Sequence, residues 1–384
     1  MSQGVPGINP PSEFLDALAR SSLVESTVKY GSLAGDIGLR TALQVEMKSV
    51  YGQNADVTPD DISVTTGCNM AFFATIMALA DPGDEVILPL PWYFNNEMTL
   101  TMLGIKPVPL PTYPHDGFVP SAELCSTLIT ERTKAIALVT PNNPTGAIYP
   151  PEVLTSFAKL ARDRGIALIL DETYRDYIIP GPPHSLFSPS SGELTDWDWR
   201  RHLIHLFSFS KSYCIPGHRL GAVVASPELQ QHIYTVLDCI QICPPRAAQH
   251  ALAPLLPSFR PFIHASAMAL KERHDVFRAH LPEPWHIGAQ GGFFAFVRHP
   301  YKGRGSTEVC KHLAEEWGIV LLPAAFFGYS APGDSLDGDR WIRFAVANVS
   351  DEKIRMVCER LKEHLATSAW ELHSHRQVLN RDHG

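Results

Sequence analysis

The sequence has no CxxC pair, no long apolar run and no block of like charges. Its seven cysteines are scattered along the chain, and only Cys239 and Cys243 share the i, i+4 spacing of a helix. No second pair of cysteines or histidines stands at ligand spacing to complete a metal site with them. The absence of a pairing pattern favours reduced thiols in a cytoplasmic protein that holds no metal.

The charge balance also excludes some partners. Acidic residues outnumber basic ones by 40 to 32, for a formal net charge of −8, whereas a protein that binds nucleic acid or an anionic membrane needs a basic face. No apolar stretch approaches the ~18 residues that span a bilayer. The first residues, MSQGVPGINPPSEF, lack the basic start and apolar run of a secretory signal. We therefore expect a cytoplasmic protein with no nucleic-acid or membrane partner.

What the sequence does contain is an alternation of two patterns from about residue 60 onward. The stretch 151–164 has helical periodicity and lies between apolar runs of strand length. Strands that are continuously apolar and alternate with helices predict a parallel sheet covered on both faces. The expected strands are 85–89, 135–140, 166–170, 203–208 and 222–225.

The pattern changes near residue 245. A long stretch of helical character runs to about residue 278, and an aromatic strand is expected at 293–297. Short strands and amphipathic helices then alternate, which predicts a second, smaller α+β domain. The expected elements are helices at 307–317 and 351–365 and strands at 319–322 and 341–346.

One candidate site residue is Lys211, in the segment Ser208-Phe-Ser210-Lys211. A single lysine at the end of a strand is normally a solvated surface residue. This one follows an apolar strand, so it lies at the carboxyl edge of the sheet, where open α/β sheets bind ligands. A desolvated lysine suits Schiff-base chemistry. Ser208 and Arg219 would then offer a hydroxyl and a fixed cation to a phosphate.

Three further polar segments follow strands or precede a helix. Asp171 suits a metal ligand, a helix cap or a partner for a protonated ring nitrogen. Asn143 lies either in a plain turn or with its amide aimed at a ligand. The segment Gly67-Cys68-Asn69 stands before the apolar helix expected at 70–79, and it predicts either ordinary capping or an anion site at the start of the helix.

In this order, these segments resemble the class I/II aminotransferases of pyridoxal 5'-phosphate (PLP) fold type I, and the resemblance covers nearly the whole chain. It implies a large domain (40–250) with a mostly parallel seven-stranded sheet between helices, and a small α+β domain (1–39 and 251–384). The matching residues are Tyr30, Gly35, Leu39 and Arg40, TGCN at 66–69, Pro-x-Pro-x-Tyr at 89–93, NNPTG at 142–146, DETY at 171–174, SFSK at 208–211, HRLG at 218–221 and WIRFA at 341–345.

The resemblance also implies roles. Lys211, Asp171 and Tyr174 would be catalytic: Lys211 would carry PLP as a Schiff base and move protons, and Asp171 would keep the pyridine nitrogen protonated. Tyr174 and Asn143 would bond the ring oxygen, and Tyr93 would stack on the ring. The phosphate would lie in a cup formed by Gly67, Cys68, Asn69, Ser208, Arg219 and, with a further hydrogen bond, Ser210.

Substrate and partner contacts are implied in the same way. Arg343, Asn143 and Gly7 would bind the substrate, with Arg343 holding its α-carboxylate. Tyr30 would reach the phosphate of a neighbouring subunit, which implies a homodimer with shared active sites. Arg246 falls near a segment that the family projects toward the partner's site, or it is a plain interface arginine.

The resemblance therefore predicts an aminotransferase of amino acid metabolism and biosynthesis that moves an amino group between an L-amino acid and a 2-oxo acid. A C–S or β-eliminating lyase or a cyclase would use the same residues, and that alternative stays open. A regulator or inactive scaffold is disfavoured because Lys211 and Asp171 are both present and no stretch has room for a helix-turn-helix. The segment Cys68-Asn69-Met70, in place of the commoner Ala-Lys-Gln, and a short N-terminal arm leave the substrate undetermined.

Overall fold

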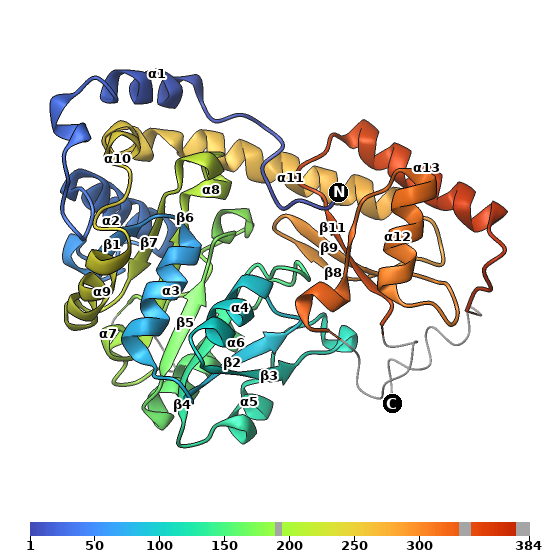
Figure 1. The fold of residues 1–384 in the computed structure, drawn as a ribbon, viewed down its shortest axis with the longest axis horizontal. Helices are drawn as coiled ribbons and strands as arrows, with labels where there is room; N and C mark the ends of the chain where they lie inside the picture. The colour runs from blue at the N-terminus through green and yellow to red at the C-terminus, as the bar shows by residue number, and fades with distance from the viewer. Residues whose placement is uncertain (189–193, 330–338, 374–384) are drawn as a thin grey trace.

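The computed structural model describes residues 1–188, 194–329 and 339–373. Its large domain is built on a seven-stranded sheet with the order β1-β7-β6-β5-β4-β2-β3 (Figure 1). The sheet lies between two layers of helices. The strands are β1 (Ile62–Thr65), β2 (Glu85–Leu90), β3 (Lys106–Pro111), β4 (Thr133–Val139), β5 (Ala167–Asp171), β6 (Leu203–Ser208) and β7 (Gly221–Val224).

The prediction of a mostly parallel sheet is confirmed. β3, β2, β4, β5 and β6 pair in parallel, and only β7 runs antiparallel to its neighbours β6 and β1. All residues of β6 are buried, as expected for a central strand covered on both faces. The apolar pattern did not reveal β3, because Pro107, Pro109 and Pro111 interrupt it. Prolines are tolerated there because β3 is an edge strand that pairs only with β2.

Helices cover both faces of this sheet. Side chains of α3, α4 and α9 form one buried cluster with residues of β2, β5, β6 and β7. Side chains of α2, α5, α6 and α10 form the larger core on the opposite face. The helices are α2 (Ile37–Tyr51), α3 (Cys68–Leu79), α4 (Phe94–Met102), α5 (Ala122–Leu128), α6 (Pro151–Arg164), α7 (Trp199–His202), α8 (Phe209–Ser212), α9 (Pro227–Ile240) and α10 (Arg246–Leu252).

The smaller α+β domain is also confirmed. Its antiparallel sheet has the order β10-β11-β9-β8, and α11 reaches from the large domain to pack against α13 (Figure 1). The elements are β8 (His286–Gly291), β9 (Phe294–Arg298), β10 (Leu322–Pro323), β11 (Trp341–Ala345), α11 (Arg260–His280), α12 (Ser306–Trp317) and α13 (Asp351–Thr367).

Two expected elements differ in extent. The strand expected at 319–322 is found only as the two residues of β10, at its C-terminal end, and a short 3-10 helix at Ala324–Phe327 ends it there. The helical stretch expected at 245–278 is two helices, α10 and α11. Pro254 and Pro257 lie between them and cannot continue a helix with full hydrogen bonding.

The N-terminal segment divides between the two domains. The carbonyl of Met1 accepts a hydrogen bond from Ala345 N–H at 2.8 Å, so the first residues join β11 of the small domain. The next helix, α1 (Ser12–Ser21), packs on α10, and its Phe14 is buried in the core of the large domain. The predicted domain boundary at residue 40 falls inside α2, and residues 1–39 contact both domains.

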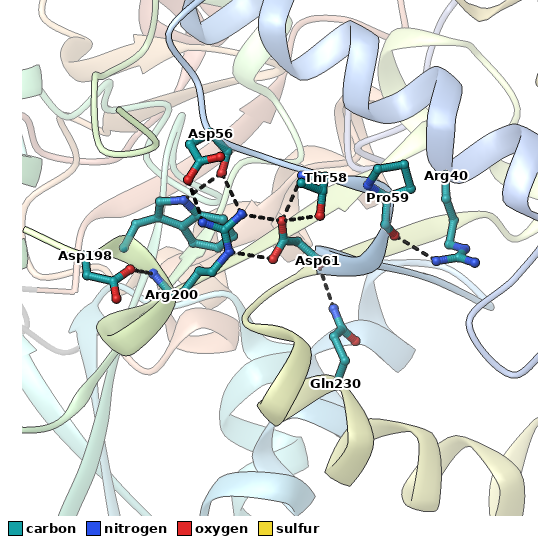
Figure 2. Close-up of polar contacts among 9 residues, drawn as sticks. Arg40, Asp56, Thr58, Pro59, Asp61, Asp198, Arg200 and Gln230 are labelled. Carbon is teal, nitrogen blue, oxygen red and sulfur yellow. Dashed lines mark hydrogen bonds and ion pairs between the residues drawn. The ribbon is translucent and has the colours of Figure 1, made fainter. Parts of the chain in front are cut away.

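The chain just before β1 is held by a charge cluster around the buried Asp61 (Figure 2). Arg200, in α7, donates to both carboxylate oxygens of Asp61 at 2.8 and 2.7 Å and to Asp56 Oδ2 at 2.7 Å. Its guanidinium also lies 4.6 Å from the ring centroid of Trp199. Asp61 is fully buried, so this bidentate pair compensates for its desolvation.

All seven cysteines are unpaired. Over the described ranges, no helix is both long and apolar enough to cross a membrane. In the same part of the chain, no group of three or more His, Cys, Asp and Glu side chains is arranged to hold a metal ion.

Candidate active site

A cavity of about 490 Å³ is lined by residues from both domains. Its size is typical of small-molecule sites. It contains most of the site residues predicted from the sequence. These are Cys68, Asn69, Tyr93, Asn143, Asp171, Tyr174, Ser208, Ser210, Lys211, Arg219 and Arg343.

Strand direction brings these residues together. Asp171 and Ser208 are the last residues of β5 and β6, and Tyr93 and Asn143 follow β2 and β4. The carboxyl ends of parallel strands share one edge of the sheet. Arg219 reaches the same edge because β7 is antiparallel and begins there, with Gly221 paired to Ser208.

Lys211 is largely desolvated in this cavity. Its Nζ donates a hydrogen bond to the carbonyl of Gly4 at 2.6 Å. Burial and, to a smaller extent, the nearby cations Arg219 and Arg343 together lower the pKa of Lys211 to about 8. An amine with this pKa has a substantial neutral fraction near neutral pH, which is the form that attacks a carbonyl.

Asp171 lies in the cavity, and within the described part of the chain its hydrogen bonds come from neutral donors alone. Its Oδ1 accepts from Thr173 N–H at 2.9 Å, and its Oδ2 lies 3.7 Å from the thiol of Cys68. Burial raises the pKa of this carboxyl group, and the bonds from Thr173 and Cys68 oppose the rise. A buried carboxylate with only neutral donors fits a protonated ring nitrogen, which would supply the missing positive charge.

Two glycines shape a cradle at the start of α3. Gly67 has a positive φ of 84°, and a Cβ there would collide with the guanidinium of Arg219. A Cβ on Gly221 would come within 2.6 Å of Cys68 N. The missing side chains therefore let Arg219 approach the first N–H groups of a helix, where an anion is stabilised. These residues fit a phosphate group.

Arg343 projects from β11 of the small domain. Its Nη1 donates to Asn143 Oδ1 at 2.8 Å and its Nη2 to the carbonyl of Ser2 at 2.5 Å, while its buried Nε has no partner. The guanidinium lies 4.5 Å from the ring centroid of Phe294. Burial lowers the pKa of Arg343 to about 10, so it remains a cation at neutral pH. This planar fork suits a carboxylate.

The two tyrosines of the cavity are protonated. Burial, followed by the charge of Asp171, raises the pKa of Tyr93 to about 12, and its hydroxyl accepts from Asn95 Nδ2 at 2.7 Å. Burial also raises the pKa of Tyr174 well above its ordinary value. Tyr174 is therefore a hydrogen-bond donor in this cavity, as its predicted contact with the ring oxygen requires.

Gly7 and Tyr30 are not brought to the cavity. Gly7 lies against the main chain of Ala347 and Asn348, and the cavity is lined instead by residues Ser2 to Val5. The contact of Gly7 with the substrate therefore stays a prediction, and a neighbouring residue, Gly4, presents its carbonyl to Lys211. Tyr30 is 80% exposed, so its contact with a partner's phosphate stays a prediction.

Arg246 does not line the cavity. Its Nε donates to Asp36 Oδ1 at 3.1 Å, and its Nη1 contacts the carbonyls of Ser26 and Lys29. It therefore holds the segment that carries Tyr30 against the start of α10.

An α/β fold with a desolvated lysine, a buried carboxylate and an anion cradle at the carboxyl edge of its sheet defines a PLP-dependent enzyme. Residues 1–361 match the family described as aminotransferase class I and II, and the chain belongs to this family. Bound PLP supplies an electron sink that accepts the charge left when a proton leaves the substrate Cα.

Known proteins support this assignment. The chain is 32% identical to an aspartate/prephenate aminotransferase of Thermus thermophilus over 94% of its own length and 89% of the relative. It is 29% identical to an arginine–pyruvate transaminase of Pseudomonas aeruginosa over 94% and 88%. A structure of Thermus thermophilus aspartate aminotransferase with maleate superimposes with a TM-score of 0.81 at 28% identity, covering 94% and 90% of the two chains. The protein is thus an aminotransferase acting on amino acids and 2-oxo acids, and the lyase alternative is not favoured.

Proposed function

We propose that amino transfer takes place in this cavity, with Lys211 as the group that moves the proton at the substrate Cα. The observation that carries the proposal is that a lysine with a pKa of about 8 lines the same cavity as Asp171 and Arg343. These are a base, a carboxylate and a carboxylate-binding cation, and the reaction needs all three.

The chain's own residues would divide the work. Arg343 and Asn143 bind the α-carboxylate of the substrate and orient its Cα toward Lys211. The amine of Lys211 accepts the Cα proton and returns it during transfer. Asp171 keeps the ring nitrogen of PLP protonated, and the phosphate is held at the start of α3 by Arg219 and Ser208.

The amino donor is proposed to have an uncharged side chain. The apolar side chains of Phe94, Leu322 and Val5 also line the cavity. Within the described lining, the basic residues Lys211, Arg219 and Arg343 already have roles in binding PLP or the α-carboxylate. A panel of amino acids tests this: aromatic and aliphatic donors should react faster than aspartate, and a preference for aspartate would contradict it.

We further propose that the protein is a homodimer. Apolar side chains are exposed on the segment before α2 and at the end of α9 and just beyond it. The N–H of Gly31 donates to Cys243 Sγ at 3.3 Å and so joins these two stretches. A second copy covering this surface would bury them and bring Tyr30 to the neighbouring site. The exposed side chains are Leu23, Val28, Tyr30, Ile240 and Ile242. Light scattering coupled to gel filtration measures the mass, and a stable monomer would contradict the dimer.

The proposed location is the cytoplasm, and the proposed context is amino acid biosynthesis. Seven unpaired cysteines fit a reducing compartment. Fractionation of the source cells locates the protein, and recovery outside the cytoplasm would contradict the proposal.

A half-reaction tests the chemistry itself. Mixing the PLP-loaded protein with an amino acid, without any oxo acid, should convert the bound cofactor to its amine form, seen by absorbance. One equivalent of 2-oxo acid should be released. Steady release of pyruvate and ammonia from a suitable donor, with the cofactor unchanged, would contradict amino transfer and restore the lyase alternative.

A further inference from the structure

Glu172 follows Asp171 directly but faces the opposite side of the sheet. Asp171 lines the cavity, whereas the side chain of Glu172 is completely buried in the large domain beneath it. Burying a carboxylate is costly unless hydrogen bonds and charge compensate for it. Glu172 has no role in the proposed amino transfer mechanism, so its burial must have another function.

One oxygen of Glu172 collects the polar contacts. Its Oε2 accepts a short hydrogen bond from the hydroxyl of Tyr51 in α2 and lies 3.1 Å from His184 Nε2 and 3.2 Å from His205 Nε2. His184 Nδ1 accepts from Leu186 N–H at 3.1 Å, which leaves the proton of a neutral His184 on Nε2, facing Glu172. Tyr51 and His184 therefore donate to one carboxylate oxygen, and His205 Nε2 lies close to both that oxygen and the hydroxyl of Tyr51.

Contacts inside the protein hold Glu172 in its ionised form. Burial raises the pKa of Glu172, but the contacts with His184 and His205 outweigh burial and hold it below its usual range. Burial lowers the pKa of His205 to about 4, so this ring is neutral at pH 7. A cation lies beside this cluster, because Arg175 Nη1 donates to the hydroxyl of Tyr51 at 3.3 Å.

The same short segment carries the site residues. Main-chain N–H of Glu172 donates to the carbonyl of Leu206 in β6 at 3.0 Å, and Asp171 O accepts from Thr140 N–H at 3.0 Å. Along this segment Asp171 and Tyr174 line the cavity, while Glu172 and Arg175 enter the buried network. Movement of the segment would break contacts that a buried charge cannot replace with water.

We propose that Glu172, Tyr51, His184 and His205 form a positioning cluster that fixes Asp171 and Tyr174 against bound PLP. The cluster touches neither PLP nor substrate and acts through the main chain of residues 171–174. This inference rests on the proposed roles of Asp171 and Tyr174.

The test compares two clusters that each hold a buried carboxylate, Glu172 and Asp61. Glu172→Ala removes the acceptor of the positioning cluster. Arg200→Ala leaves Asp61 without its bidentate partner at the start of β1 (Figure 2), and Arg200 does not line the cavity. Both variants should lower the unfolding temperature of the PLP-free protein. Arg200→Ala therefore controls for the effect of lost stability on PLP binding. Glu172→Gln, which keeps the shape and one acceptor oxygen, serves as the conservative variant.

Two readouts report on the position of the cofactor. We expect Glu172→Ala to weaken PLP binding about tenfold, as loss of a supporting partner behind a ligand-binding residue does, and to reduce the visible circular dichroism of the bound cofactor. Glu172→Gln should recover part of both signals. Arg200→Ala should leave both at the level of the unaltered protein.

Unchanged PLP affinity and circular dichroism in Glu172→Ala would overturn the proposal, and so would an equal loss in Arg200→Ala. If Glu172→Ala does not fold, Tyr51→Phe, which removes one donor, must show a smaller loss in the same direction, and no loss would overturn the proposal. Failure of the proposed function is separate, because it would appear as no half-reaction in the unaltered protein.

Discussion

The ε-amino group of Lys211 and the main-chain carbonyl of Gly4 are joined by a hydrogen bond of 2.6 Å. A second carbonyl of the same segment, that of Ser2, accepts from Arg343. The first residues of the chain thus contact both cations that the proposed reaction uses. A substrate carboxylate would take the place of Ser2 O on Arg343, so binding is expected to displace this segment.

The lowered pKa of Lys211 predicts how PLP attaches to the protein. Only the neutral amine forms the covalent bond, and it becomes the major form above a pH of about 8. The rate of PLP attachment to the cofactor-free protein should therefore rise with pH and level off above about 8, as followed by absorbance. Lys211→Ala is the control and should give no covalent attachment. A rise continuing to pH 10 would show that Lys211 has an ordinary pKa.

Replacing Asp171 by Asn should impair the chemistry more than binding. The amide keeps the shape but removes the negative charge that would hold the ring nitrogen protonated. Losing one preorganised electrostatic partner costs about 10²–10³ in rate, and the half-reaction should slow by that factor. PLP should still attach to Lys211. A half-reaction rate close to that of the unaltered protein would contradict the role of Asp171.

Replacing Arg343 by Lys should raise KM for the amino acid. Lysine keeps the charge but loses the planar fork that binds a carboxylate at two points and that donates to Asn143 Oδ1 at 2.8 Å. Loss of a charged hydrogen bond costs about 1.5–3 kcal/mol, so kcat/KM should fall at least tenfold. PLP affinity serves as the control and should stay the same, because Arg343 is assigned to the substrate.

Replacing Arg200 by Ala should reduce stability without affecting catalysis. The change leaves the fully buried Asp61 without its ion pair. Because Arg200 itself is partly exposed, we expect a loss of about 2 kcal/mol, below the range for fully buried pairs. Denaturant unfolding measures the loss. The half-reaction rate per folded molecule should not change. A lower rate would show that Arg200 contributes to catalysis.

Elements whose apolar pattern and end residues are clear in the local sequence were predicted correctly, and elements without them were missed. The helix expected at 151–164 is α6 with the same bounds, because its apolar positions and its ends are local features. β1 and β3 were missed, since the polar residues Ser63 and Thr65 interrupt the apolar run of β1 and β3 carries three prolines. The break between α10 and α11 was missed although Pro254 and Pro257 stand there.

The candidate site divides in the same way. Lys211, Asp171 and Arg219 were found because each is part of a motif beside a strand, and parallel strands place their carboxyl ends together. Gly4 was missed because a glycine carbonyl has no pattern of its own. Glu172 was read only as a letter of the DETY motif, since its partners Tyr51 and His205 are far away in the sequence.

The sequence alone determined the fold class, because strand and helix periodicity depend on neighbouring residues. Its motifs, through their resemblance to a known family, determined the cofactor and the order of the site residues. Only the tertiary structure decided which side chains lose water and which face each other. Lys211 gains its lowered pKa from burial and from Arg343, which is distant in the chain. Burial and distance are properties of the packed molecule, so no local pattern specifies them.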